Sequence, residues 1–381
     1  MPSRRNAILI ATFLAGFAAV AIWAGPRLFH RYYSHGLTPV VVAKGLETPW
    51  SMAFLPDGRI LVTERPGRLR LVEADGRVSA PLAGLPPVRV MGEGGLMGVV
   101  LDPRFAQNRL VYWSYSESGP AAPELASTAV ARGRLAEDGL HDVQVIFRQP
   151  EKTEDGRHFG GRLLFAPDGR LFIGLGDRSR RTDAQLPASA HGKIMRIEAD
   201  GSLPEGNGFP GGNAVQGAVW SLGHRNVQGL ALQPGTGQLW ASEHGPNGGD
   251  EVNVIHRGHN YGWPVITYGC EYVTCAKIGE GTAKEGMDQP AAWFGPASLP
   301  LTGMTFLTSD RYPEWKGQLF VASLRWDQAL VRLRVEGDHV VAREPMWLGT
   351  NRVLRDVQQG PDGWLYVITN SPDGRILRLE R

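Results

Sequence analysis

One structural unit recurs six times along this chain beyond residue 40. Each copy consists of an apolar strand, a turn rich in Pro, Asp and Gly, and a second strand of β-branched and aromatic residues, which is typical of a β-hairpin. In chain order the copies begin at Ser51, Gly98, Arg162, Gly229, Gly303 and Arg355. A single hairpin of this kind cannot bury its apolar residues alone, so the copies must pack against one another.

The second strands decide how the hairpins pack. They are nearly continuous apolar runs, for example Ile60 to Thr63 and Leu365 to Thr369, and a strand of this kind is covered on both faces. A sheet stacked between two neighbouring sheets has such strands, whereas a sandwich strand alternates apolar with polar residues. We therefore predict an all-β, six-bladed β-propeller over residues 37–381. Two β-domains side by side are the alternative, but no linker of distinct composition divides the chain.

The two ends of the predicted propeller complement each other. Pro39 to Ala43 forms a lone strand, and the last repeat provides only three strands up to Arg381. We expect the N-terminal strand to pair with the last blade and so to close the ring of blades.

Residues 1–36 precede the propeller and have the pattern of an export segment. Arg4 and Arg5 stand before an uncharged run from Ala7 to Gly25, as in a signal peptide or in an N-terminal membrane anchor followed by a short linker. Both interpretations place the propeller in the periplasm or outside the cell, either free or held at the inner membrane by residues 7–25. A buried first helix is the alternative, although the run has no polar face.

Cys270 and Cys275 are the two cysteines of the chain, and both lie in the short segment GCEYVTC. Two thiols are too few for a tetrahedral structural zinc site. We expect them to form a disulfide, which suits an oxidising compartment. Two free, buried cysteines are the alternative.

Charged residues recur at one height of the predicted propeller. The chain carries 40 Lys and Arg against 38 Asp and Glu, and this net charge of +2 gives no general affinity for nucleic acid. If the first strand of each repeat lines a central channel, the residues just before it gather at one mouth; Glu93, His158, Arg225 and Arg352 stand there at matching offsets. The second strands end at the same mouth, at Asp177, His244 and Arg325, with Arg355 nearby.

These residue types indicate the chemistry of a ligand. Several guanidinium groups at one channel mouth repel one another unless a multiply charged anion neutralises them, and arginine binds carboxylates through paired hydrogen bonds. His158 shares the mouth, and imidazole is the side chain best suited to accept a proton near neutral pH. We therefore predict a polycarboxylate ligand with His158 as a general base. A purely structural histidine is the alternative.

The segment from Ser242 to Pro264 is rich in glycine and in oxygen ligands. Its glycines and Pro246 leave backbone carbonyls free of strand pairing, and Asp250 and Glu251 add carboxylates, a combination that suits Ca²⁺. The segment does not match an EF-hand loop, and a glycine-rich turn with a capping Asp is the alternative.

Six motifs together resemble one known family. They are GEGGLMGVVLDPRF, HFGGRLLFAPDGRLFIGLGD, LGHRNVQGLA, EHGPNGGDEVN, NYGWP and LRDVQQGPDGWLY. From about Leu46 to its C-terminus, the chain resembles the soluble aldose sugar dehydrogenases of the glucose and sorbosone dehydrogenase family, which carry pyrroloquinoline quinone (PQQ) and Ca²⁺. The resemblance implies a six-bladed propeller with the same two cofactors.

The resemblance also implies roles for individual residues. His158 resembles the general base of the family, and Arg225 and Asn226 resemble the pair that contacts the quinone. Gly245 and Pro246 resemble the carbonyl donors to the Ca²⁺ that coordinates the cofactor. The remaining matches are His244, beside these donors, Glu251 and Tyr261, which resemble ligands of a further Ca²⁺, and Arg325, which falls where the family places a Lys or Arg over a cofactor carboxylate.

Three positions depart from the family pattern. Glu93 stands where some members carry Gln, which puts a carboxylate beside an anionic quinone. Arg157 stands where some members carry an Asp that orients the base, so that role is vacant or filled from elsewhere. Arg352 and Arg355 are three residues apart where the usual spacing is two; Arg355 is the better match, and Arg352 needs a small bulge to reach the site.

The reaction that the resemblance implies is oxidation of the C1 hydroxyl of an aldose to a lactone, with hydride transfer to Ca²⁺-bound PQQ. The sequence has no haem-attachment motif CxxCH, so electrons would leave for a separate acceptor, such as a quinone, a cytochrome or a dye. Membrane contact would come only through the N-terminal segment. A Ca²⁺-dependent propeller lactonase or other hydrolase, and a non-catalytic sugar-binding propeller, are the alternative functions.

Overall fold

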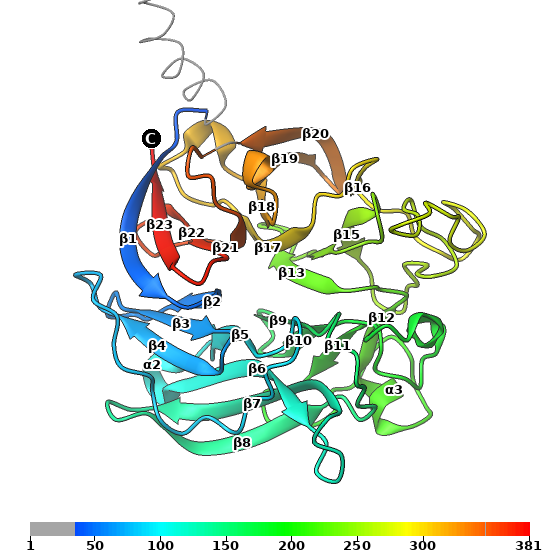
Figure 1. The fold of residues 1–381 in the computed structure, drawn as a ribbon, viewed down its shortest axis with the longest axis horizontal. Helices are drawn as coiled ribbons and strands as arrows, with labels where there is room; N and C mark the ends of the chain where they lie inside the picture. The colour runs from blue at the N-terminus through cyan, green and yellow to red at the C-terminus, as the bar shows by residue number, and fades with distance from the viewer. Residues whose placement is uncertain (1–34, 347) are drawn as a thin grey trace, which may run out of the picture.

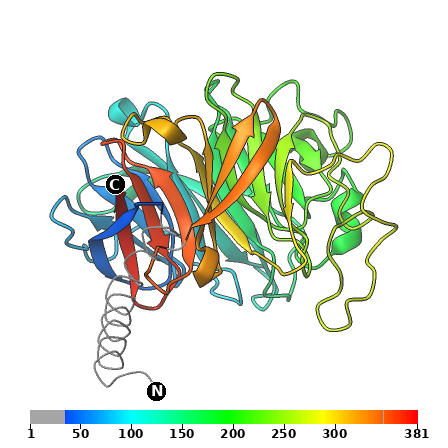
Figure 2. The same cartoon turned by 90° about the horizontal axis from the view of Figure 1, so that it is seen from above.

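The computed structural model of the chain describes residues 35–346 and 348–381. These residues form six antiparallel sheets that stand as blades around a common centre (Figure 1), and Figure 2 shows the same blades from a perpendicular direction. The predicted six-bladed propeller is confirmed. The predicted export segment lies outside the described residues except for its last two positions. Within the described ranges no helix has the length and apolar character needed to cross a membrane.

Blades 1 to 3 run from residue 49 to residue 222, and blade 1 has three strands where the others have four. From the centre outward their strands are β2 (Pro49–Phe54), β3 (Ile60–Glu64) and β4 (Arg68–Val72); β5 (Leu96–Leu101), β6 (Leu110–Ser118), β7 (Ala126–Leu135) and β8 (Leu140–Arg148); and β9 (Gly160–Phe165), β10 (Leu171–Leu175), β11 (Lys193–Ile197) and β12 (Val219–Leu222). Three short helices lie between strands, namely α2 (Phe105–Asn108), the 3₁₀ helix η1 (Arg181–Gln185) and α3 (Ala214–Ala218).

Blades 4 to 6 use the rest of the chain and the strand at its start. From the centre outward their strands are β13 (Val227–Leu232), β14 (Leu239–Glu243), β15 (Asp250–Ile255) and β16 (Ala292–Phe294); β17 (Leu301–Phe306), β18 (Leu319–Ser323), β19 (Leu330–Glu336) and β20 (His339–Met346); and β21 (Leu354–Gln359), β22 (Leu365–Thr369), β23 (Gly374–Glu380) and β1 (Thr38–Leu46). The 3₁₀ helices η2 (Pro313–Trp315) and η3 (Trp326–Gln328) flank β18.

The ring of blades closes in the predicted way. The innermost strands contact one another in the order β2, β5, β9, β13, β17, β21 and back to β2. The outermost strand of blade 6 is β1, which pairs antiparallel with β23 from Thr38 opposite Glu380 to Leu46 opposite Gly374. In Figure 1 the blue N-terminal strand therefore lies along the red C-terminal one. This pairing ties the two ends of the described chain together, and β2 of blade 1 contacts β21 and β22 of blade 6.

The hairpins form for the reasons that their sequences indicate. The second strands β3, β10, β14, β18 and β22 are buried at every position, because sheets cover both of their faces. In the PDG turns between the first and second strands of blades 1, 3 and 6, the glycines Gly58, Gly169 and Gly363 have φ values of +87°, +83° and +84°, a region that favours glycine. The preceding aspartates accept a hydrogen bond from the backbone N–H two residues on, which fixes each turn.

Each of the six innermost strands carries a bulge near its N-terminal end. The residues left out of the pairing are Trp50, Met97 with Gly98, Gly161, Gln228, Thr302 with Gly303, and Arg355. A bulge turns a side chain out of the regular alternation of the strand. Trp50, Gln228 and Arg355 consequently line one cavity at the channel mouth, so the repeated bulge prepares a ring of side chains for a ligand.

Candidate active site

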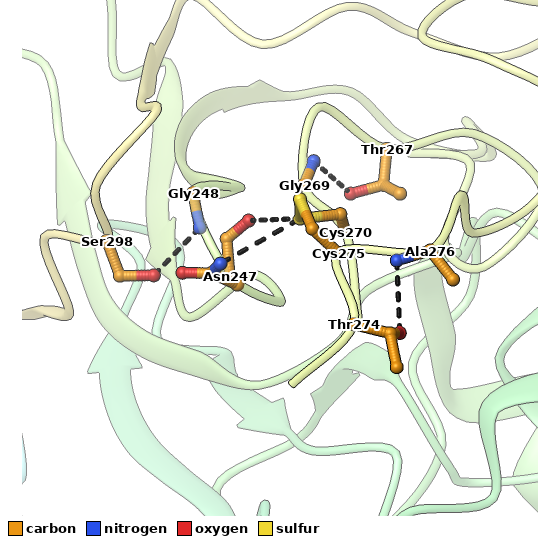
Figure 3. Close-up of a disulfide and its surroundings, with 9 residues drawn as sticks. All are labelled: Asn247, Gly248, Thr267, Gly269, Cys270, Thr274, Cys275, Ala276 and Ser298. Atoms are coloured by element: carbon orange, nitrogen blue, oxygen red, sulfur yellow. Dashed lines mark hydrogen bonds between the residues drawn. A yellow bond between two sulfur atoms is a disulfide. The ribbon is translucent and has the colours of Figure 1, made fainter. Parts of the chain in front are cut away.

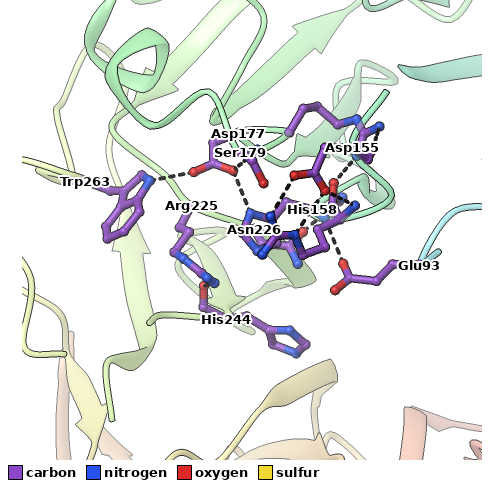
Figure 4. A network of polar contacts seen from close by, with 12 residues as sticks. Glu93, Asp155, His158, Asp177, Ser179, Arg225, Asn226, His244 and Trp263 are labelled. Carbon is purple, nitrogen blue, oxygen red and sulfur yellow. Dashed lines mark hydrogen bonds and ion pairs between the residues drawn. The ribbon is translucent and has the colours of Figure 1, made fainter. Parts of the chain in front are cut away.

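His158 lies immediately before β9, and its ring is held by Asp177, which follows β10. The Nδ1 atom of His158 is 2.7 Å from Oδ1 of Asp177 (Figure 4). An ionised carboxylate only accepts hydrogen bonds, so Nδ1 carries the proton and Nε2 is left as the acceptor. Nε2 has no hydrogen-bond partner in the described ranges and is not sealed from solvent. This histidine is arranged to take a proton from a ligand.

Asp177 is fully buried and has its own partners. Its Oδ2 accepts a hydrogen bond of 2.7 Å from the indole N–H of Trp263, and its Oδ1 accepts one of 2.9 Å from the backbone N–H of Ser179. Burial alone would raise the pKa of Asp177, but the hydrogen bond and the charge of His158, with the charge of Arg225, hold its pKa below the ordinary value. Asp177 therefore fills the orienting role that the sequence left open at Arg157, whose side chain pairs with Asp155 instead.

Arg225 and Asn226 enter the site from the turn between β12 and β13. The Nη1 of Arg225 donates a hydrogen bond of 3.0 Å to the carbonyl of His244, and its backbone N–H donates one of 2.7 Å to Glu243. The Oδ1 of Asn226 accepts a bond of 3.1 Å from the N–H of Gly160. Both side chains are buried, and the Nε of Arg225 and the Nδ2 of Asn226 have no partner among the described residues. Two donors are thus left for a ligand.

His244 and Arg355 line a cavity of about 190 Å³ at the channel mouth. Burial and the charges of Arg355 and Arg225 lower the pKa of His244 to about 3, so its imidazole is neutral at neutral pH. The guanidinium of Arg355 lies 4.7 Å from the centre of the Trp50 ring and forms no ion pair or hydrogen bond with the described part of the chain. Burial, together with repulsion by Arg162, lowers the pKa of Arg355 to about 9, so it keeps its charge at neutral pH.

Glu93 lines the same cavity, as expected from its place in the second repeat. Its Oε2 accepts a hydrogen bond of 2.8 Å from the backbone N–H of His158. The carboxylate therefore contacts the histidine backbone directly, a role that the sequence did not indicate.

Arg325 and Arg352 were also predicted at this mouth, and in the structure each is paired with a nearby aspartate. Arg325 forms an ion pair of 2.7 Å with Asp327, two residues further along the chain. Arg352 donates to the carbonyl of Asp373 at 2.8 Å and pairs with its carboxylate at 3.2 Å. Neither arginine lines the cavity that Arg355 and His244 share. The bulge expected near Arg352 is present, but the residue that it leaves out of the strand pairing is Arg355.

Glu243 and Glu251 stand directly opposite each other on β14 and β15. The Nδ2 of Asn253 donates to both carboxylates, at 3.0 and 3.3 Å. Burial and the neighbouring charge of Glu243 raise the pKa of Glu251 to about 8. Two facing carboxylates of this kind repel each other, so the arrangement favours a cation between them.

Carbonyl groups lie beside these carboxylates. Gly245, Pro246 and Tyr261 line the same small cavity as Glu243 and Glu251. The Tyr261 hydroxyl is committed, since it donates to the Val254 carbonyl at 2.6 Å and accepts from the His256 N–H at 2.8 Å. If Tyr261 binds a cation, it must therefore do so through its backbone carbonyl and not through its hydroxyl. The described residues hold no cluster of three or more His, Cys, Asp or Glu placed for a metal, so any Ca²⁺ site here would depend on carbonyls.

The predicted disulfide is present between Cys270 and Cys275 (Figure 3). The backbones of Cys270 and Asn247 exchange two hydrogen bonds of 3.1 Å, and the hydroxyl of Tyr272, inside the disulfide loop, donates to the Gly245 carbonyl at 3.4 Å. The loop closed by the disulfide thus packs on the turn that presents the Gly245 and Pro246 carbonyls.

Several residues of the site were not predicted. Glu243 anchors the backbone of Arg225, Trp263 holds Asp177, and Trp50 lies against Arg355. The only sequence signal for Glu243 and Trp263 was their position inside the motifs EHGPNGGDEVN and NYGWP. Trp50 had no such signal, because its part depends on the bulge in β2.

Comparison with known proteins places this geometry in context. The family model described as glucose/sorbosone dehydrogenase matches residues 46–378. The chain is 40% identical over 364 residues to the aldose sugar dehydrogenase YliI of Escherichia coli (strain K12), which covers 94% of this chain and 95% of the relative. The crystal structure of the soluble aldose sugar dehydrogenase from Escherichia coli in the apo form superposes with a TM-score of 0.85 at 40% identity, over 90% of this chain and 99% of that one.

A more distant structure agrees with this assignment. The PQQ-bound form of aldose sugar dehydrogenase from Streptomyces coelicolor superposes with a TM-score of 0.73 at 30% identity, over 90% of this chain and 96% of that one. The family match covers most of the propeller and includes every site residue described above. The chain is therefore a member of the glucose/sorbosone dehydrogenase family.

Proposed function

We propose that this protein is a PQQ-dependent dehydrogenase that oxidises aldose sugars at C1. The observation that carries the proposal is a group of polar atoms on Arg225, Asn226, His244 and Arg355 that find no partner among the described residues, beside the oriented His158. The relatives support it, since one is named an aldose sugar dehydrogenase and another was solved with PQQ bound.

The residues at the mouth fit PQQ, which is a tricarboxylate. The Nε of Arg225, the Nδ2 of Asn226 and the Nε2 of His244 are buried without a partner in the described ranges, and each such atom costs roughly 1–3 kcal/mol unless a ligand bonds to it. Arg355 adds a positive charge that no described carboxylate neutralises by contact. Carboxylate and carbonyl oxygens of PQQ would satisfy the free donors and balance the charge. When bound, PQQ supplies the acceptor for the hydride from C1 of the sugar.

The residues of the neighbouring loop fit Ca²⁺. The Gly245 and Pro246 carbonyls would hold the ion that polarises the cofactor, as the family resemblance implies. Glu251 and the carbonyl of Tyr261 would hold a further ion, and the opposed carboxylates of Glu243 and Glu251 support this because a cation would relieve the repulsion between them.

The proton step belongs to His158. Its neutral Nε2 would accept the proton of the C1 hydroxyl while its Nδ1–H remains bonded to Asp177. The buried carboxylate of Asp177 then stabilises the imidazolium that forms, and the indole N–H of Trp263 keeps that carboxylate in place. His158 therefore needs no movement of its ring to change its protonation state.

The positive side chains have a separate task. Hydrogen bonds to Glu243 and to the His244 carbonyl hold the backbone and the guanidinium of Arg225 in place. Such a preorganised cation stabilises negative charge that develops at a bound ligand without reorganisation. Arg355 lines the same cavity as His244, and it would hold a carboxylate of the cofactor.

The remaining assignments follow from this activity. The substrate would be an aldose, and a separate acceptor such as a quinone, a cytochrome or a dye would take the electrons away. The propeller would act in the periplasm or outside the cell, with residues 7–25 as a removed signal or as an anchor to the inner membrane.

The decisive experiment replaces the base. His158→Ala, loaded with PQQ and Ca²⁺, should reduce a dye with aldoses about 10³-fold more slowly in kcat, the usual scale of a lost general base, while it still takes up PQQ stoichiometrically. His141→Ala is the matched control, because His141 forms a similar pair with Asp138 at the exposed edge of blade 2. Unchanged turnover in His158→Ala would exclude the base assignment.

The same assay separates the alternative functions. A lactonase would hydrolyse a sugar lactone in the absence of PQQ, and a sugar-binding propeller would bind an aldose but would not reduce the dye. Either result in the wild-type protein would overturn the dehydrogenase proposal.

A further inference from the structure

The peptide bond between Arg157 and His158 is held at both of its polar atoms. Its N–H donates a hydrogen bond of 2.8 Å to Oε2 of Glu93. Its carbonyl oxygen, which belongs to Arg157, accepts a hydrogen bond from Nη1 of Arg178. Side chains from two different blades therefore set the plane of the peptide that carries the imidazole.

This peptide needs support because of the conformation of His158. Its φ is +55°, in the left-handed region that a residue with a Cβ adopts at a cost of roughly 1–2 kcal/mol. Residues stay in such conformations only where the surroundings over-determine them, and these places are concentrated at functional sites. Without its partners, the backbone would relax to a negative φ and carry the ring away from Asp177.

Arg178 is placed as a clamp on this loop. It is 1% exposed, and its guanidinium lies 3.4 Å from the centre of the Phe159 ring. Besides the carbonyl of Arg157, it donates to the carbonyls of Asp155 and, at 3.1 Å, of Ala126. Burial lowers the pKa of Arg178 only to about 10, so it is a cation at neutral pH.

The partners of Arg178 are unusual for a buried cation. None of its hydrogen bonds in the described ranges goes to a carboxylate; all go to carbonyls, and two of these belong to the loop just before His158. A buried charge is costly unless it is bonded, so the bonds to the loop and the position of the guanidinium depend on each other.

Gly176 packs directly against the backbone carbonyl of His158. A Cβ at Gly176 would lie 1.8 Å from the carbonyl oxygen of His158, so the glycine allows the two segments to approach. Gly176, Asp177 and Arg178 are consecutive, and they contact the backbone, the ring and the preceding carbonyl of the same region. The turn after β10 is thus shaped around this one histidine.

We propose that Arg178 and Glu93 are positioning residues for the general base: they hold the Arg157–His158 peptide so that Nε2 of His158 faces the hydroxyl to be oxidised. Figure 4 shows Glu93 and Asp177 on different sides of His158. The proposal rests on the proposed function for its catalytic meaning, whereas the geometry of the histidine can be measured without any cofactor.

Two pairs of variants test it. Arg178→Met removes the guanidinium with little loss of volume, and Arg178→Lys keeps a charge. Glu93→Leu removes the acceptor of the His158 N–H, and Glu93→Gln keeps an acceptor oxygen. Arg196→Met is the control for the loss of a buried arginine, since Arg196 lies over Trp220 and pairs with Asp168 away from the site.

The first readout is the proton NMR spectrum of the protein without PQQ. The Nδ1–H of His158 that is bonded to Asp177 should give a downfield resonance, which His158→Ala removes and so assigns. We expect this resonance to be lost or shifted in Arg178→Met and Glu93→Leu, and to be unchanged in Arg196→Met. A resonance at the wild-type position in both Arg178→Met and Glu93→Leu would overturn the proposal, whatever the turnover of the loaded variants.

The second readout is turnover of the loaded enzyme. Misplacing a catalytic group by about 1 Å costs on the order of 100-fold in rate, so kcat should fall by roughly this factor in Arg178→Met and Glu93→Leu, with KM changed much less. Glu93→Gln should recover at least tenfold of what Glu93→Leu loses. Equal losses in Glu93→Gln and Glu93→Leu would contradict the positioning role. If the wild-type enzyme itself fails to oxidise aldoses, the proposed function fails and the NMR result still stands alone.

Discussion

The arginines predicted at the channel mouth fall into two groups. Arg225 and Arg355 sit at the mouth with positive charge that no described carboxylate contacts through the guanidinium. Arg325 and Arg352 are each paired with an aspartate close by, Asp327 and Asp373. The sequence placed all four near the mouth from their positions in the repeats, although Arg355 matched the family pattern better than Arg352. The contrast teaches that a guanidinium held in a site without a counter-ion indicates an anionic ligand, whereas one with its own aspartate is already neutralised within the fold.

The largest expected effect concerns binding of PQQ. Arg355→Met should weaken PQQ binding by about 10- to 100-fold, because a hydrogen bond to a charged group contributes roughly 1.5–3 kcal/mol. Arg352→Met should change the dissociation constant less than twofold, since Arg352 is bonded to Asp373 and does not line the cavity. Absorbance titration of the protein with PQQ in the presence of Ca²⁺ measures both. Equal losses in the two variants would remove the distinction between the groups.

A smaller effect of opposite sign is expected for stability without cofactor. Arg355→Met should raise the free energy of unfolding by about 1 kcal/mol, because it removes a poorly compensated charge and keeps an apolar side chain against Trp50. Chemical denaturation of the PQQ-free protein measures this change. A loss of stability in Arg355→Met would mean that the guanidinium is already satisfied within the fold.

The smallest effects belong to the paired group. Asp327→Ala and Asp373→Ala each break an ion pair that is partly exposed, and such pairs contribute about 0–1 kcal/mol. We expect melting temperatures within a few degrees of the wild type and unchanged affinity for PQQ. A gain in PQQ affinity in Asp327→Ala would show that Arg325 can turn into the site once it is released.

The fold could be predicted from the sequence because its determinants are local and repeated. The hairpin signal occurs six times, and the burial of strands such as β10 and β22 follows directly from their apolar runs. Closure by β1 followed from a strand that was missing in the last repeat. The hairpins depend on residues close together in the chain, where sequence patterns are informative, and the long-range closure was inferred by counting the strands of the repeats.

The site could be predicted only in part, because it depends on the direction in which each side chain points as well as on its position along the channel. Counting along the repeat placed Arg352 and Arg355 near the mouth, but the bulge between Leu354 and Asp356 decides which of them turns toward the cavity. Likewise Asp177 was expected at the mouth, yet its bond to His158 joins two loops of blade 3, and no spacing rule connects them. The hydrogen bond from Arg178 to the backbone carbonyl of Arg157 cannot be predicted from residue types, because every residue has such a carbonyl.

One measurement tests the central claim most directly: a crystal structure of the protein loaded with PQQ and Ca²⁺. The account predicts PQQ at the channel mouth, with its oxygens bonded to Arg225, Asn226 and Arg355 and its reactive carbonyl facing Nε2 of His158. Density for PQQ beside Arg325 or Arg352, or anywhere distant from the His158–Asp177 pair, would contradict it.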